Sequence, residues 1–273
     1  MSQLTLPTVY LIRHGQSYFN VAYDSTEDGK VEPIYDLKYV DACLTDLGIQ
    51  QAINARKQAK QLNIEVIISS PLTRAIQTSL LIFNEQLDER HFFTSSNTIP
   101  ENNELVELSN QIPVLVSHHH SEILNATCDI GHGLENLQQR FQHHHHLIDW
   151  SAMNSYEHRE RWWHKANEQQ NIPHLLLYRN HGHVQHLHEL DSQKIQIVRE
   201  EHEHVTARIK AFLTQLSQHT EARIAVVGHG TFFKNLVGRY IANCEIVQLD
   251  WNYCAMKYGI PSDPKQLGTL SIL

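Results

Sequence analysis

Four short apolar runs, each followed by a polar stretch, are the feature of this chain that most restricts its fold. The runs cover residues 8–12, 64–68, 112–116 and 224–227, and β-branched residues are frequent in them. Apolar residues at helical spacing follow the second and fourth runs, and Thr45 can cap a further helix that ends near Leu62. Apolar strands that alternate with helices indicate a parallel sheet covered on both faces. The sequence therefore predicts an α/β fold.

Polar residues stand at the carboxyl end of three of these runs. His14 follows the first run, Ser69-Ser70-Pro71 follows the second, and His229 follows the fourth. Ligand sites of open parallel sheets lie beyond the carboxyl ends of the strands. We therefore expect three segments that are distant in the sequence to form one polar site.

The residue types at this edge are suited to phosphoryl transfer. A neutral imidazole such as that of His14 can attack phosphorus and form a phosphohistidine that water later opens. A guanidinium group can bind two phosphoryl oxygens at once. Its positive charge also disfavours protonation of a nearby imidazole, which therefore stays neutral. Arg13 and Arg74 can supply two guanidinium groups, and His229 can donate a further hydrogen bond. Such a pocket needs no metal and no cofactor.

Four ordered blocks of this sequence resemble the signature of the histidine phosphatase superfamily, the phosphoglycerate mutase-like proteins. The blocks are Leu11-Ile12-Arg13-His14-Gly15-Gln16-Ser17 with Asn20, Leu44-Thr45-Asp46-Leu47-Gly48 with Gln51-Ala52, Ser69-Ser70-Pro71-Leu72-Thr73-Arg74-Ala75-Ile76-Gln77-Thr78, and Val226-Val227-Gly228-His229-Gly230. The resemblance covers roughly residues 8–83 and 200–246 well and the middle of the chain only loosely. Four blocks in the right order are a far more specific signal than an isolated Arg-His-Gly.

The resemblance implies a fold and a set of roles. The fold is a three-layer α/β/α sandwich of the phosphoglycerate mutase-like type, with a mostly parallel central sheet. His14 would be the phosphorylated nucleophile. Arg13, Arg74 and His229 would form the phosphate pocket, and Asn20 would be an additional phosphate contact.

A general acid for the leaving alcohol is the remaining role that the resemblance implies. Glu122 is the preferred candidate, because its position before Cys128-Asp129 resembles a stretch of the eukaryotic-like branch of the family. Glu107 is the other candidate, although it precedes the third apolar run. The segment Glu89-Arg90-His91 is similar to a motif of cofactor-dependent mutases, but it lies too close to Arg74 and no Tyr-Gly follows it. Hydrolysis is therefore favoured over mutase-type transfer.

A histidine-rich stretch interrupts the alternating pattern. Residues from about His143 to Glu201 do not fit the scheme, so we interpret 117–200 as an insertion into a single domain of residues 1–273 that caps the site. His143 to His146 favour a solvated helix end, and His181, His183, His186 and His188 are a better but still weak metal candidate. We expect His132 to be a loop histidine. The Trp162-Trp163 pair resembles one in the eukaryotic-like branch, and we interpret it as packing of the insertion on the core.

Composition restricts the class of partner. The formal net charge is −8, which argues against a nucleic-acid binder, although protonation of the 21 histidines would reverse its sign. The chain has no apolar run long enough to cross a membrane and no secretory signal, and its four scattered cysteines favour a reduced, cytoplasmic setting. We expect a phosphatase acting on a small phosphorylated substrate. The alternatives are phosphoglycerate mutase-type transfer and a non-catalytic phosphate- or metal-binding protein.

Overall fold

The computed structural model describes residues 6–26, 32–85, 87, 112–163 and 199–260. Three features of the sequence analysis lie outside these residues: Glu107, the Glu89-Arg90-His91 segment, and the cluster of His181, His183, His186 and His188.

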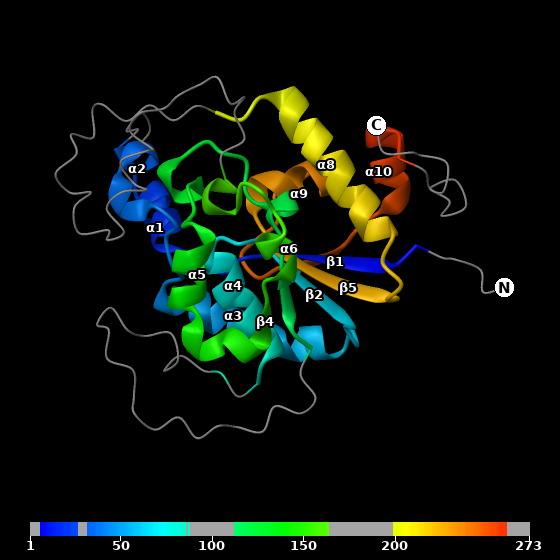
Figure 1. Ribbon diagram of the computed structural model, residues 1–273, viewed down its shortest axis with the longest axis horizontal. Helices are drawn as coiled ribbons and strands as arrows, with labels where there is room; N and C mark the ends of the chain where they lie inside the picture. The colour runs from blue at the N-terminus through cyan, green and yellow to red at the C-terminus, as the bar shows by residue number, and fades with distance from the viewer. Residues whose placement is uncertain (1–5, 27–31, 86, 88–111, 164–198, 261–273) are drawn as a thin grey trace.

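A six-stranded sheet runs through the centre of the described part of the chain (Figure 1). The four predicted strands are present as β1 (Thr8–Arg13), β2 (Val66–Ser69), β3 (Val114–Val116) and β5 (Arg223–Gly228). Two edge strands, β4 (Ile148–Asp149) and β6 (Ile246–Gln248), complete the sheet. The spatial order is β4-β3-β2-β5-β1-β6, and every pairing is parallel except that of β1 with β6. The predicted mostly parallel sheet is confirmed.

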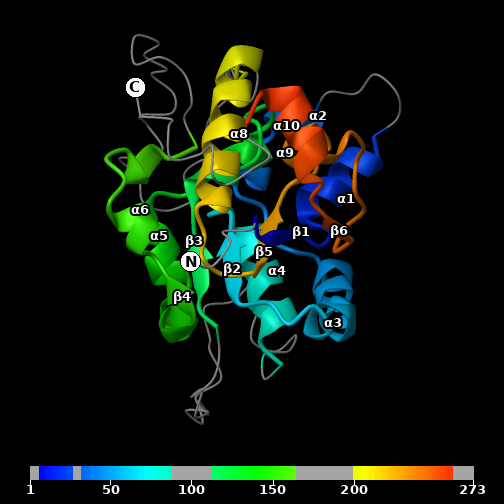
Figure 2. The same ribbon diagram turned by 90° about the vertical axis from the view of Figure 1, so that its right-hand side faces the viewer.

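Helices cover both faces of this sheet, as the three-layer prediction requires. Helices α3 (Asp46–Lys60) and α4 (Thr73–Phe83) lie on one face, and α8 (His202–Ser217), α9 (Gly230–Val237) and α10 (Trp251–Tyr258) lie on the other (Figure 2). Successive strand residues point to opposite faces. Leu11 and Val226 therefore pack with α8, α9 and α10, whereas Ile12 and Val227 pack with α3 and α4. This two-sided burial explains why the central strands read as continuous apolar runs.

The predicted helix cap at Thr45 is also present. The Thr45 hydroxyl accepts the backbone N–H of Gly48 at 3.1 Å, which satisfies one of the unpaired donors at the start of α3. The described residues between β1 and α3 form the short elements α1 (Tyr18–Asp24), α2 (Glu32–Tyr35) and the 3-10 helix η1 (Leu37–Tyr39).

The segment after β3 consists of short elements packed against the sheet. In chain order they are η3 (His118–His120), η4 (Thr127–Asp129), α5 (Leu134–Arg140), η5 (Gln142–Leu147), β4, α6 (Ser151–Asn154) and η6 (Arg159–Arg161). The prediction that residues from about His143 onward lie outside the alternating scheme is wrong for β4. Ile148 pairs in parallel with Val114, so the sheet extends into the histidine-rich stretch. A two-residue strand is too short to produce an apolar run.

The tryptophan pair and the histidine run of this segment lie in different environments. Trp162 and Trp163 are buried in a core cluster with Leu137 and Met153, and the Trp162 indole N–H donates to the His132 carbonyl at 2.8 Å, so packing is what they do. His143, His145 and His146 are exposed in η5. Among the described residues, no group of three or more His, Cys, Asp or Glu side chains is arranged to hold a metal ion. None of the described helices is long and apolar enough to cross a membrane.

Candidate active site

The carboxyl ends of β1, β2 and β5 bring His14, Ser70 and His229 together. The strand register explains this, because Arg13 lies opposite Gly228 and Ser69 lies opposite Val227. The His14 N–H donates to the Gly228 carbonyl at 2.9 Å, and the Ser70 N–H donates to the Val227 carbonyl at 3.0 Å. The rings of His14 and His229 have centroids 5.2 Å apart. The predicted convergence of distant segments at one edge is present.

The hydrogen bonds of His14 define its tautomer. Its Nδ1 lies 2.7 Å from the Gly15 carbonyl, and a carbonyl can only accept, so the proton is on Nδ1. Its Nε2 lies 3.2 Å from Nε–H of Arg74, which donates to the Nε2 lone pair. Burial, followed by the charges of Arg74 and Arg13, lowers the pKa of His14 well below the ordinary value. The result is a neutral imidazole whose Nε2 lone pair points toward Arg74.

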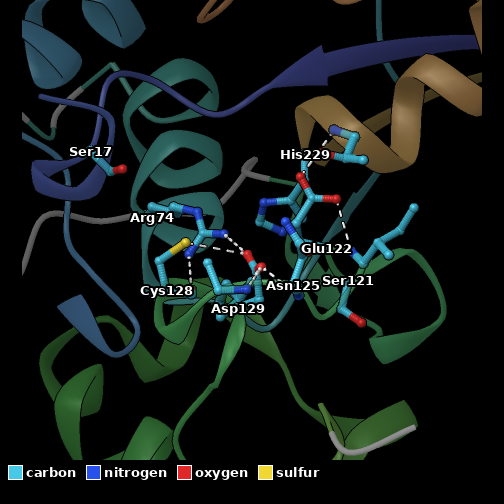
Figure 3. Close-up of polar contacts among 12 residues, drawn as sticks. Ser17, Arg74, Ser121, Glu122, Asn125, Cys128, Asp129 and His229 are labelled. Carbon is cyan, nitrogen blue, oxygen red and sulfur yellow. Dashed lines mark hydrogen bonds and ion pairs between the residues drawn. The ribbon is translucent and has the colours of Figure 1, made fainter. Parts of the chain in front are cut away.

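Arg74 is held in place at the start of α4. Its Nη1 donates to the Cys128 carbonyl at 2.6 Å, and its Nη2 lies 3.4 Å from the Asp129 carboxylate (Figure 3). The preceding residue, Thr73, is fixed by Asp41, which accepts the Thr73 N–H at 2.7 Å and the Thr73 hydroxyl at 2.6 Å. Leu72 stands at the N-cap and has no side-chain acceptor, so Asp41 caps this helix from another loop.

Two buried polar atoms beside His14 have no hydrogen-bond partner in the described part of the protein. They are Nε of Arg13 and Nδ1 of His229. The rest of each side chain is anchored: Nη1 of Arg13 donates to the Ile241 carbonyl at 3.0 Å, and Nε2 of His229 lies 2.7 Å from the Ser70 hydroxyl. Buried polar atoms are nearly always paired, so two unpaired ones next to the His14 ring indicate a candidate binding position for a polar ligand. If Ser70 donates to Nε2, the Nδ1–H of His229 is available for a ligand oxygen.

Glu122 lies at the N-terminus of α9, next to His229 (Figure 3). Its carboxylate accepts the N–H groups of Thr231 at 3.0 Å and Phe232 at 2.9 Å, and also its neighbour Ile123 at 2.8 Å. His229 is the N-cap residue of α9 and makes no side-chain cap, so Glu122 supplies the acceptor there. The structure thus brings the preferred acid candidate to the site.

Asp129 is a second carboxyl group at the site, and it was noted in the sequence only as part of a motif. Its Oδ2 accepts the N–H groups of Asn125 at 3.1 Å and Ala126 at 2.9 Å. Burial and the charge of Glu122 raise the pKa of Asp129 to about 6, although Arg74 and the two N–H groups act in the other direction. Asp129 therefore retains a proton more readily than an ordinary carboxyl group.

Asn20 is placed differently from the other candidates. Its amide oxygen accepts the Ser17 N–H at 3.0 Å, and the Ser17 hydroxyl accepts the Asn20 N–H at 3.3 Å, which is a capping box at the start of α1. A phosphate contact for Asn20 stays a prediction.

His132 is a buried loop residue. Burial lowers its pKa to about 4, and its Nε2 lies 2.9 Å from Nη2 of Arg140. Sequence reasoning missed Asp41 and also Asn243, whose amide donates to the His14 carbonyl at 2.8 Å. Neither residue had a local signal, because each acts on a segment that is distant in the sequence.

Known proteins resemble this chain in sequence. The sequence model of the histidine phosphatase superfamily (branch 1) matches residues 9–94. Phosphoglycerate mutase-like protein 1 of Arabidopsis thaliana is 27% identical over 268 residues, covering 88% of this chain and 79% of that protein. A Schizosaccharomyces pombe protein named as a phosphatase is 33% identical over 86 residues, covering 31% of this chain and 35% of its own length. Among solved structures, YhfR of Bacillus stearothermophilus has a TM-score of 0.45 at 16% identity, covering 89% of this chain and 91% of its own.

Proposed function

The chain belongs to the histidine phosphatase superfamily, and we propose that it hydrolyses small phosphomonoesters through a phosphohistidine on His14. Its relatives make it an enzyme of the phosphatase or mutase kind. The observation that carries the proposal is the tautomer of His14, because Nδ1–H donates to the Gly15 carbonyl and leaves the lone pair on Nε2 next to Arg74. A nucleophile in the correct protonation state beside a guanidinium is what attack on a phosphate ester requires.

The first step transfers the phosphoryl group to the protein. Nε2 of His14 attacks phosphorus as the bond from phosphorus to the ester oxygen breaks. The hydrogen bond that Nε–H of Arg74 donates to Nε2 of His14 is replaced by one to a phosphoryl oxygen. Nε–H of Arg13 and Nδ1–H of His229, which have no partner in the described structure, donate to the other phosphoryl oxygens. These donors stabilise the transition state more than the substrate because its charge is more spread over the oxygens. We assign the proton for the leaving oxygen to Glu122.

The second step returns the protein to its starting state. Water attacks phosphorus, the bond from phosphorus to Nε2 breaks, and the carboxylate of Glu122 accepts the proton that the water loses. The Nδ1 proton of His14 stays in place through both steps, because the Gly15 carbonyl stabilises the positive charge that phosphorylation produces. Inorganic phosphate then leaves the pocket.

Hydrolysis is the preferred outcome of the phosphohistidine, and mutase-type transfer is the alternative. The S. pombe relative is named as a phosphatase and the Arabidopsis relative as mutase-like, so each outcome has a relative whose name fits it. Conversion of phosphoglycerate, assayed with and without bisphosphoglycerate, separates the two.

The four cysteines are free thiols, which supports the proposed reduced, cytoplasmic setting.

A panel of phosphomonoesters tests the proposal. We expect the wild-type protein to release phosphate from at least one of them, and brief incubation followed by a denaturing quench at high pH to trap phosphate on His14, identified by mass spectrometry. His14→Ala abolishes both signals, whereas the exposed His145→Ala is the matched control and retains them. Turnover that survives His14→Ala would refute the mechanism. A chain that binds phosphate without turnover would be the non-catalytic alternative.

A further inference from the structure

Arg208 is a buried arginine in the middle of α8 whose contacts reach the loop that carries Glu122. Its Nε and Nη2 donate to the two oxygens of Glu200 at 2.9 and 2.7 Å, which is a bidentate pair. Its Nη1 donates to the carbonyl of His119 at 3.0 Å and to the carbonyl of Ser121 at 2.7 Å. The side chains of Arg208 and Glu200 are 7% and 0% exposed, so the pair is shielded from solvent.

Glu200 also binds the loop that carries Glu122, at a residue that follows Glu122 in the chain. The Glu200 N–H donates to the Leu124 carbonyl at 3.1 Å. The backbone is therefore held at His119 and Ser121 before Glu122, and at Leu124 after it. The result is a clamp, formed by Arg208 and Glu200, around the proposed acid.

The clamp also contacts the element that binds the carboxylate. The guanidinium carbon of Arg208 lies 4.9 Å from the centre of the Phe232 ring. The N–H of Phe232 is one of the donors to Glu122, so Arg208 packs on the residue that orients the acid as well as on the acid's loop.

Packing alone does not require an ion pair at this place. Removing two charges from water has a large cost, and apolar residues of similar volume are often as stabilising as a buried pair. What apolar residues lack is the directional donation to two carbonyls that flank one side chain. We propose that Arg208, held by Glu200, is a positioning residue that keeps the Glu122 carboxyl at the leaving-group oxygen. The inference rests on the proposed function and on Glu122 as its acid.

Position matters because proton transfer is short-ranged. A general acid must come within about 3 Å of the atom it protonates, and a displacement of about 1 Å can lower a rate by about a hundredfold. Loosening the clamp should therefore reduce protonation of the leaving group while attack by His14 continues.

The leaving group distinguishes this role from a merely structural one. Dinitrophenyl phosphate has a leaving group that departs without a proton, whereas phenyl phosphate needs one. The comparison uses kcat/KM, which covers the steps up to departure of the leaving group. In Arg208→Lys the charge is kept but the fork that spans Glu200 and two carbonyls is lost. We expect kcat/KM for phenyl phosphate to fall at least tenfold and that for dinitrophenyl phosphate to stay within about twofold.

Two further variants complete the experiment. Glu200→Gln should give the same selective loss, and it carries the test if Arg208→Lys does not fold, as judged by circular dichroism. Arg223→Lys is the matched control, because Arg223 pairs with Glu65 near the amino end of β5, far from the site. This variant should change kcat/KM for neither ester. In a Glu122→Gln background, Arg208→Lys should cause no additional loss on phenyl phosphate, since the group being positioned is gone.

The outcomes separate the two proposals. Equal losses on both substrates, no loss on either, or an additive loss in the Glu122→Gln background would overturn the positioning role of Arg208. A Glu122→Gln variant that lowers kcat/KM equally for both esters would also overturn the positioning role of Arg208. Phosphatase activity that depends on His14 would in that case still support the proposed function. Failure of the wild-type protein to release phosphate from these two esters and from every ester of the panel would refute the proposed function itself.

Discussion

Asp129→Asn should make the protein more stable at neutral pH, although it removes a partner of Arg74. The pKa of Asp129 is raised from an ordinary 3.8 to about 6, chiefly by burial and by Glu122. A carboxyl group with a raised pKa in the folded state binds its proton more tightly there than in the unfolded chain. The folded wild-type protein therefore loses stability as the pH rises from about 4 to about 6, and the loss is complete above that range.

The magnitude follows from the size of the shift. A change of about two pKa units corresponds to about 3 kcal/mol in the free energy of unfolding. The substituted amide does not titrate and resembles the protonated carboxyl group, since its oxygen can still accept the N–H groups of Asn125 and Ala126. The variant and the wild type should be similar near pH 4. Near pH 7 the variant should be more stable by about 3 kcal/mol, or about 6–12 °C in Tm.

Urea unfolding of both proteins at a series of pH values between about 4 and 8 measures this difference. Asp24→Asn is the matched control, because Asp24 is exposed and the same substitution there should change stability by less than about 0.5 kcal/mol. A difference between Asp129→Asn and wild type that does not change with pH would refute the reasoning. A variant less stable than the wild type at pH 7 would show that the ion pair with Arg74 outweighs burial.

Three other outcomes are expected. Because the pKa of His14 is lowered well below its ordinary value, the single-turnover rate of phosphohistidine formation from dinitrophenyl phosphate should stay flat as the pH falls from about 7.5 to about 6; a decline with the midpoint of a free imidazole would contradict this. Gly48→Ala should lower the free energy of unfolding by at least about 1–3 kcal/mol, measured by urea unfolding, because the added methyl would lie 2.1 Å from the Gln16 carbonyl oxygen; an unchanged midpoint would be unexpected. Chelators such as EDTA should leave the phosphatase rate unchanged, and inactivation that added metal reverses would contradict the metal-free mechanism.

Local sequence was sufficient to predict the central strands and to identify the residues to which we assign the reaction. Apolar runs predict β1, β2, β3 and β5 because strands buried on both faces need apolar side chains at nearly every position. The motif blocks then place His14, Arg74 and His229 directly after strand ends or at a helix start. Their convergence follows from the parallel sheet, since the carboxyl ends of parallel strands share one edge.

The tertiary structure decided which polar groups complete the site. The edge strands β4 and β6 contain only one and two apolar residues, Ile148 and Ile246-Val247, which are too few to form an apolar run. The tautomer of His14, the raised pKa of Asp129 and the clamp on Glu122 all depend on donors and acceptors from distant segments. A periodic apolar pattern identifies the face that a segment buries, because burial acts on whole elements. A hydrogen bond depends on the position of a single atom, and that position is set only when the elements pack together.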